Sequence, residues 1–153
     1  ERSIVCFEKA LIYQELLYPS KIGDHWAKSF GELAFTGMKM KDWDLSLDYI
    51  MKGINSYYTN PILSSASESP ELDELPIENA SSLAYLLKWR AQTLNSKFEE
   101  TTDWALAKMA FDAYTLYDSY STRLRKTLIS DKDKLSVSKG LKKFYGKAAQ
   151  LIG

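Results

Sequence analysis

The stretch MKMKDWDLSLDYIMKG, residues 38–53, decides the fold, because a second stretch, KFEETTDWALAKMAFDAY at residues 97–114, follows the same plan. In both, an Asp-Trp pair precedes apolar residues at helical spacing. Trp104 follows Trp43 by 61 positions (104 minus 43), and Phe111 follows Ile50 by the same interval. Leu45/Leu106 and Ser46/Ala107 are two further pairs. A helical pattern that returns in this way predicts repeated units that stack on one another.

Composition favours a single globular domain and gives no sign of a charged partner. The chain has 153 residues, of which 45% are hydrophobic and 26% charged, values typical of a soluble protein. Its 20 basic and 20 acidic residues cancel, so we expect neither a nucleic-acid nor a membrane surface. The 121–153 segment is nevertheless basic, and binding of nucleic acid there stays a minor alternative. It would use Arg123, Arg125, Lys126, Lys142 and Lys143.

The single cysteine, Cys6, excludes an internal disulfide framework and predicts a reducing, cytoplasmic compartment. No run of about 18 apolar residues could span a bilayer. The first residue is Glu rather than Met and no signal peptide follows, so we interpret the chain as a piece of a longer protein.

Apolar spacing of three to four residues predicts helices throughout, interrupted by one acidic, Ser- and Pro-rich connection at 59–79. The expected helices span 2–18, 25–41, 43–58, 80–96, 103–126 and 131–152. The residues expected to face inward are Ile4, Phe7, Ala10 or Leu11, Ile12 and Leu16 or Leu17 in the first helix, Trp26, Phe30, Leu33, Ala34 and Met38 in the second, Leu83, Leu87, Ala91 and Leu94 in the fourth, and Leu135, Leu141, Tyr145, Ala148 and Ile152 in the sixth.

Capping residues support these boundaries. Asp24 and Asp42 are expected N-caps, whose carboxylates accept hydrogen bonds from the free amides of a first turn. Ser130 and Asp133 resemble a capping box for the sixth helix. The cations of RLRK, 123–126, suit the negative end of the fifth helix dipole.

Small and large residues alternate in a way that predicts close helix packing. Ser46, Ile50 and Gly53 are arranged small-x3-large-x2-small. Small residues let two helix backbones approach, and the large residue fills the adjacent groove. The first helix has the same order in Ser3, Phe7 and Ala10. The fifth helix has Ala107 and Phe111 in the first two positions, but its third position is the large residue Tyr114. The second and fourth helices share a large residue followed four positions later by alanine, in Phe30-x3-Ala34 and Leu87-x3-Ala91.

This pattern resembles the tetratricopeptide repeat (TPR). The signature lies on Phe30, Leu33, Ala34, Ser46, Ile50 and Gly53 in one unit, and on Leu87, Ala91, Leu94, Ala107 and Phe111 in the next. Gly37 occupies a usually aromatic position, the closing proline comes late at Pro61, and the second unit has a connection about four residues longer. The resemblance implies an all-α solenoid of TPR-like hairpins with about six helices, one domain over 1–153. The alternative is an unrelated helical bundle with coincidental spacing.

The repeat pattern also predicts which helix of a hairpin lies at each end of the chain. Residues 2–18 have the pattern of a second helix in a hairpin, and FYGKAAQLI, 144–152, that of a first helix. We therefore expect the chain to be a window from a longer array.

The last part of the chain resembles a narrower family, the repeat region that precedes the caspase-like CHAT peptidase domain of large bacterial proteins. The resemblance depends on SSLAYLLKWRAQTLN (81–95), Tyr117 to Arg125, the 130–135 joint and Phe144-Tyr145-x2-Ala148. It implies a peptidase downstream of this chain, for which the repeats serve as a sensing or scaffolding arm.

We identify no enzyme in the sequence, and expect no cofactor and no metal. CHAT peptidases use a His–Cys pair, but Cys6 precedes His25 here and lies in an apolar helix, where we expect a small core residue. Asp44 and Asp48 are four residues apart on one helix, as on an ordinary solvated face. Ser136-x2-Lys139 lacks the motifs that accompany a Ser/Lys nucleophile pair.

The TPR resemblance implies a concave partner surface lined by the first helix of each hairpin. Carried over by position, it consists of Lys28, Phe35, Met38, Lys39, Tyr85, Lys88 and Gln92. Aromatic and Met side chains provide adaptable apolar contact, and Lys binds carboxylates. A protein or peptide is the expected partner, and an ordinary solvent face is the alternative. Two further alternatives are a Tyr- and Trp-lined pocket for a small ligand and a weak latch between 61–78 and the basic end of the chain.

Overall fold

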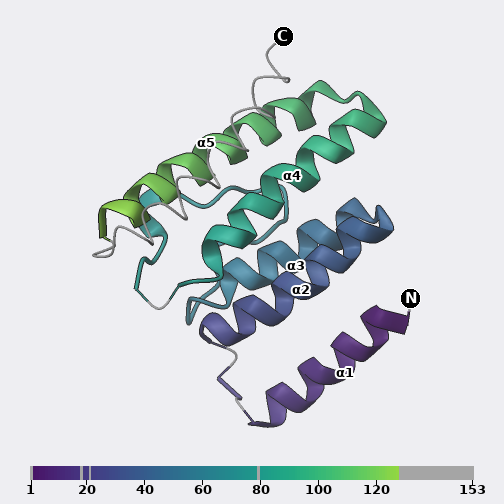
Figure 1. Cartoon of the computed structure of the whole chain (residues 1–153), viewed down its shortest axis with the longest axis vertical. Helices are drawn as coiled ribbons and strands as arrows, with labels where there is room; N and C mark the ends of the chain where they lie inside the picture. Colours follow the sequence, from purple (N-terminus) through teal and green to yellow (C-terminus); the bar gives the residue numbers. More distant parts are fainter. Residues whose placement is uncertain (1, 18, 21, 79, 128–153) are drawn as a thin grey trace.

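The computed structural model describes residues 2–127 apart from 18, 21 and 79 (Figure 1), and in this part of the chain the structure is all-helical. The helices are α1 (Arg2–Leu17), α2 (Asp24–Met40), α3 (Trp43–Asn55), α4 (Leu83–Thr101) and α5 (Trp104–Thr127), with one short 3-10 helix, η1 (Leu72–Glu74). The five predicted helices between residues 2 and 127 are confirmed. The predicted sixth helix, 131–152, lies outside the described residues.

The helices pair into two antiparallel hairpins, α2/α3 and α4/α5, which lie side by side, with α1 against α2 at one end (Figure 1). Contacts between the hairpins run from α3 to α4 and from α2 to α4. The helices therefore follow one another in space in their order along the chain.

The repeated Asp-Trp pair forms the same turn in both hairpins. Lys41 and Thr102 both adopt a left-handed conformation, with φ of 59° and 55°. The following aspartates cap the next helix, since Asp42 accepts a hydrogen bond from the Leu45 amide at 3.1 Å and Asp103 from the Ala105 amide at 2.9 Å. Local sequence thus produces one turn design twice.

Several boundaries differ from those predicted, since α3 ends at Asn55 rather than at 58 and α4 begins at Leu83 rather than at 80. The connection of the second hairpin is not longer, because both turns have two residues; α4 instead continues to Thr101, about one helical turn further. Asp24 is not the N-cap of α2, since Gly23 occupies that position. The Asp24 carboxylate is bound elsewhere, as described below.

The core contains the small residues that were predicted to lie between helices. Ala34, Ala91 and Ser46 are fully buried, and the Ser46 hydroxyl lies 3.2 Å from that of Thr93 on α4. A Cβ on Gly37 would lie 3.0 Å from the backbone nitrogen of Ser46, so α2 and α3 approach here without room for a side chain. The close contact with Ser46 explains why glycine occupies position 37.

The acidic connection is not merely a break between helices, because it packs against α4 and α5. Leu63 and Leu75 are buried within the hydrophobic core. Arg90, only 3% exposed, donates hydrogen bonds to the backbone oxygens of residues 66–68 and to the Ser69 hydroxyl. Arg123 on α5 donates to the carbonyls of Leu72 and Leu75. Among the described residues, Arg90 and Arg123 therefore bind the segment through its backbone carbonyls, and most of the basic end in the predicted latch lies outside the described residues.

The predicted inward face of α1 is confirmed at Leu11, the alternative to Ala10, and is wrong at Ala10, Ile12, Leu16 and Leu17. Ile12, Leu16 and Leu17 are exposed, and Leu11 is the partly buried residue that packs against the core. Ala10 is exposed as well, and the side chains of Ile4 and Phe7 lie outside the described set. The apolar face of α1 is wider than α2 alone covers.

The two tryptophans of the repeat lie in different surroundings, contrary to the expectation from a shared template. Trp43 is partly buried and donates from Nε1 to Glu100 at 2.7 Å, whereas Trp104 is 77% exposed and packs only its ring against Phe98. Ile50 is 1% exposed, but its counterpart Phe111 is 45% exposed. The local turn repeats, while the cover provided by α4 over α3 has no equivalent for α5 among the described residues.

Candidate interaction groove

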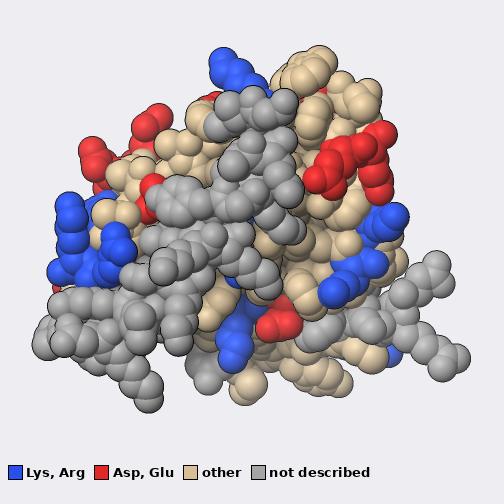
Figure 2. Space-filling view, turned by 45° about the horizontal axis from the view of Figure 1, so that its top comes forward, with Lys and Arg blue, Asp and Glu red and all other residues tan. Residues whose placement is uncertain are grey.

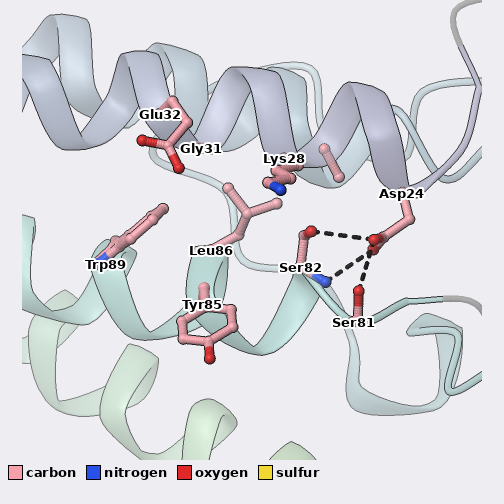
Figure 3. Close-up of a pocket in the computed structure, with 10 residues that line it drawn as sticks. Asp24, Lys28, Gly31, Glu32, Ser81, Ser82, Tyr85, Leu86 and Trp89 are labelled. Atoms are coloured by element: carbon pink, nitrogen blue, oxygen red, sulfur yellow. Dashed lines mark hydrogen bonds between the residues drawn. The ribbon is translucent and has the colours of Figure 1, made fainter.

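A groove of about 460 Å³ lies between α2 and α4, the first helices of the two hairpins (Figure 3). α2 contributes one wall, and the start of α4 with the two residues before it contributes the other. The residues that line it are Asp24, Ala27, Lys28, Gly31, Glu32, Ser81, Ser82, Tyr85, Leu86 and Trp89.

Asp24 fixes one end of the groove by joining the start of α2 to the start of α4. Its carboxylate accepts hydrogen bonds from the Ser81 hydroxyl at 2.6 Å, from the Ser82 amide at 2.8 Å and from the Tyr57 hydroxyl at 2.5 Å. Burial by itself would raise the pKa of Asp24, but the hydrogen bonds outweigh it and the pKa is lowered. Burial together with the Asp24 contact raises the pKa of Tyr57. This cluster is structural, because its polar atoms satisfy one another.

Aromatic side chains line the rest of the groove and continue along the same face. The Trp89 ring centroid lies 5.6 Å from that of Phe35 across the two helices and 6.1 Å from that of Tyr85. Gly31 lets Trp89 approach α2, since a Cβ there would lie 3.0 Å from the Trp89 ring. Tyr85 is 59% exposed and Phe35 is also exposed, so the row offers aromatic surface to solvent.

Some of the predicted partner-binding residues line the groove in the structure, and others do not. Lys28 and Tyr85 line the groove itself. Phe35 extends the aromatic row, and Lys39 lies over its ring, with Nζ 5.2 Å from the centroid. Met38, Lys88 and Gln92 are partly buried and do not line the groove.

Trp89, Glu32 and the serines before α4 are groove residues that the sequence analysis missed. Trp89 follows Tyr85 by four residues, so helical spacing alone places both on one face. Helical spacing could therefore have identified Trp89 as a groove residue from the sequence. No local pattern places Ser81 and Ser82 in the groove, because their positions depend on hydrogen bonds to Asp24, which lies 57 and 58 residues earlier in the chain.

The remaining chemical candidates do not meet at one site. Cys6 is exposed rather than a core residue, and His25 is exposed at the start of α2. Asp44 pairs with Lys97 at 2.5 Å and Asp48 with Lys52 at 2.7 Å, so both carboxylates form ordinary ion pairs. Ser136 and Lys139 lie outside the described residues. Within residues 2–127, leaving out the gaps, no group of three potential metal ligands occurs.

A second hollow adjoins the groove. This hollow of about 690 Å³ lies between α1 and α2, and Lys28 borders both. Its other residues are Ala10, Tyr13, Gln14, Leu17, His25 and Ser29.

Figure 2 shows small groups of both charge signs over the coloured part of one face. None of the described helices combines the length and apolarity needed to cross a bilayer.

Comparison of the chain with protein-family models, with curated proteins and with solved structures found no match.

Proposed function

We propose that this chain is a non-catalytic protein–protein interaction module of TPR-like repeats, whose groove between α2 and α4 binds a peptide segment of a partner. The observation that carries the proposal is a row of aromatic side chains along the two helices, in which the partly buried Trp89 lies between the exposed rings of Phe35 and Tyr85. Aromatic residues are enriched in the energetic centres of protein interfaces. On the resemblance to the region before CHAT peptidases, the module is the sensing or recruiting arm of a larger protein.

Three features support a peptide as the occupant. The groove is open and elongated along two helices rather than closed around a small molecule (Figure 3). Its walls are held by the Asp24 cluster and by the Gly31–Trp89 contact, so little ordering is needed on binding. Finally, the exposed Lys28 and Glu32 line the groove and provide one charge of each sign for polar contacts with the partner.

Panning of a random dodecapeptide display library on the full chain tests the proposal. Peptides selected in this way are expected to bind through the groove, so that combined Phe35→Ala and Tyr85→Ala substitution lowers their affinity about tenfold or more. Both side chains are exposed, which keeps the effect on folding small. Trp104→Ala removes an exposed aromatic outside the groove and is the matched control. Recovery of no binder, or equal effects of the groove and control variants, would contradict the proposed function.

A small ligand in a Tyr- and Trp-lined pocket remains the second candidate, since Tyr85 and Trp89 do line this groove with polar groups nearby. The tyrosines inside the fold give less support to this small-ligand function. Tyr120 donates its hydroxyl to the Pro76 carbonyl at 2.8 Å and Tyr57 to Asp24, so these hydroxyls serve the fold.

A further inference from the structure

We infer that the groove recognises an arginine side chain of the partner peptide, with the guanidinium stacked on Trp89 and paired with the Glu32 carboxylate. The inference rests on the proposed function and specifies the chemistry of its partner.

Glu32 is the acidic group in the groove that is available to a partner. The Asp24 oxygens already accept hydrogen bonds from Tyr57, Ser81 and Ser82. The Glu32 carboxylate has no hydrogen bond or ion pair with any described residue, and its side chain is exposed. Figure 3 shows it projecting from α2 toward the end of the groove where Trp89 rises from α4. A carboxylate without a partner among the described residues therefore lines the same groove as its largest aromatic ring.

Lys28 does not neutralise this carboxylate although it lies one helical turn away. Lys four residues before Glu is the less favourable order for an ion pair within a helix, because it opposes the helix dipole. No ion pair between them is present. Glu32 thus has no cationic partner among the described residues and can pair with a cation of the bound peptide.

The aromatic row is already seen to accept a cation. Lys39 lies over the Phe35 ring at 5.2 Å, at the end of the row remote from Asp24. Trp is the best aromatic partner for a cation, and Arg is used more often than Lys because its plane stacks on the ring. A guanidinium on Trp89 could also form two parallel hydrogen bonds to a carboxylate. The pairing of Trp89 with Glu32 therefore favours arginine over lysine or an uncharged side chain.

Affinity measurements with matched peptides test this inference. In a library-selected peptide, replacing arginine by citrulline, which has nearly the same shape without the charge, is expected to lower affinity for the full chain about tenfold. Glu32→Gln should cause a similar loss with the arginine peptide and little change with the citrulline peptide. Asp112→Asn, which neutralises an exposed acid on α5, is the matched control.

The outcomes separate this inference from the proposed function. Groove-dependent binders that lack arginine, or equal affinity of the arginine and citrulline peptides, would overturn the inference and leave the interaction module intact. Insensitivity of the arginine peptide to both Glu32→Gln and Trp89→Leu would also overturn it. Failure to recover any groove-dependent peptide would contradict the proposed function and the inference together.

Discussion

At the scale of single residues, small side chains determine how closely these helices approach. Ala34 and Ala91 are completely buried at corresponding places in α2 and α4, and Gly37 leaves no space before Ser46. Protein interiors are packed as densely as organic crystals, so an added side chain at such a place forces its neighbours to move. Stability should therefore be sensitive to volume at these positions.

Substituting Ala34→Leu or Ala91→Leu should each lower the free energy of unfolding by about 1–3 kcal/mol, because the larger side chain overpacks a closed contact. Urea denaturation followed by circular dichroism measures the change. Ala105→Leu, at an exposed position near the start of α5, is the control and should have little effect. Equal stability of all three variants and the parent would show that the assigned packing register is wrong.

Asp24 should make stability depend on pH. Its pKa is lowered in the folded protein, below the ordinary value of about 3.9, so its stabilising contribution is complete above that pH and disappears as pH falls through the folded value. At pH 7, Asp24→Asn should cost about 1–3 kcal/mol through the hydrogen bonds it weakens. Denaturation at pH 7 and pH 3 should show the difference between the two proteins shrinking in acid. A difference that does not change with pH would contradict this assignment.

At the scale of elements, the acidic connection gains its structure from α4. Arg90 is buried and donates to several oxygens of residues 66–69, and its burial lowers its pKa to about 10, which still leaves it charged at neutral pH. A buried charge is tolerated only when its hydrogen bonds are satisfied. This helix residue therefore determines the course of a segment more than twenty positions earlier.

Arg90→Met keeps much of the side-chain volume but removes every donor. It should lower the free energy of unfolding by about 1–3 kcal/mol or more, because carbonyl groups lose their partners. Amide hydrogen exchange should rise chiefly in residues 63–75, which mass spectrometry can locate. Lys108→Met on the exposed side of α5 is the control. Unchanged protection of 63–75 would mean that other contacts hold the connection.

At the scale of the whole molecule, burial is uneven along the series of helices. α4 lies between α3 and α5 and buries eight of its residues, whereas α1 touches α2 and exposes Ile12, Tyr13, Leu16 and Leu17. Regions with few buried contacts open locally at low free energy. The first helix should therefore be less stable than the centre.

Hydrogen exchange of the full chain should show this gradient. Amides of residues 8–16 in α1 should exchange at least about a hundredfold faster than those of 87–95 in α4, which corresponds to about 2.7 kcal/mol of local stability. Time-resolved exchange with peptide-level detection measures both in one sample. Similar protection of the two helices would show that α1 is held as firmly as the core.

Sequence by itself determined the features that depend on neighbours along the chain. Helical periodicity placed the five described helices, the repeated Asp-Trp pair marked where α3 and α5 begin, and the spacing of Ala34, Ser46 and Ala91 identified buried contacts. These sequence-based predictions are correct because a helix, its cap and its apolar stripe are determined by residues three or four positions apart.

Only the tertiary structure decided what covers each helix and where the charged groups go. It left Trp104 exposed while placing Trp43 against Glu100, turned Asp24 from an expected cap into a link between α2 and α4, and brought Glu32 and Trp89 into the lining of one groove. Each of these results depends on residues tens of positions away. A local pattern sets which face of a helix is apolar, but the neighbouring elements determine whether that face is covered and which polar groups meet across it.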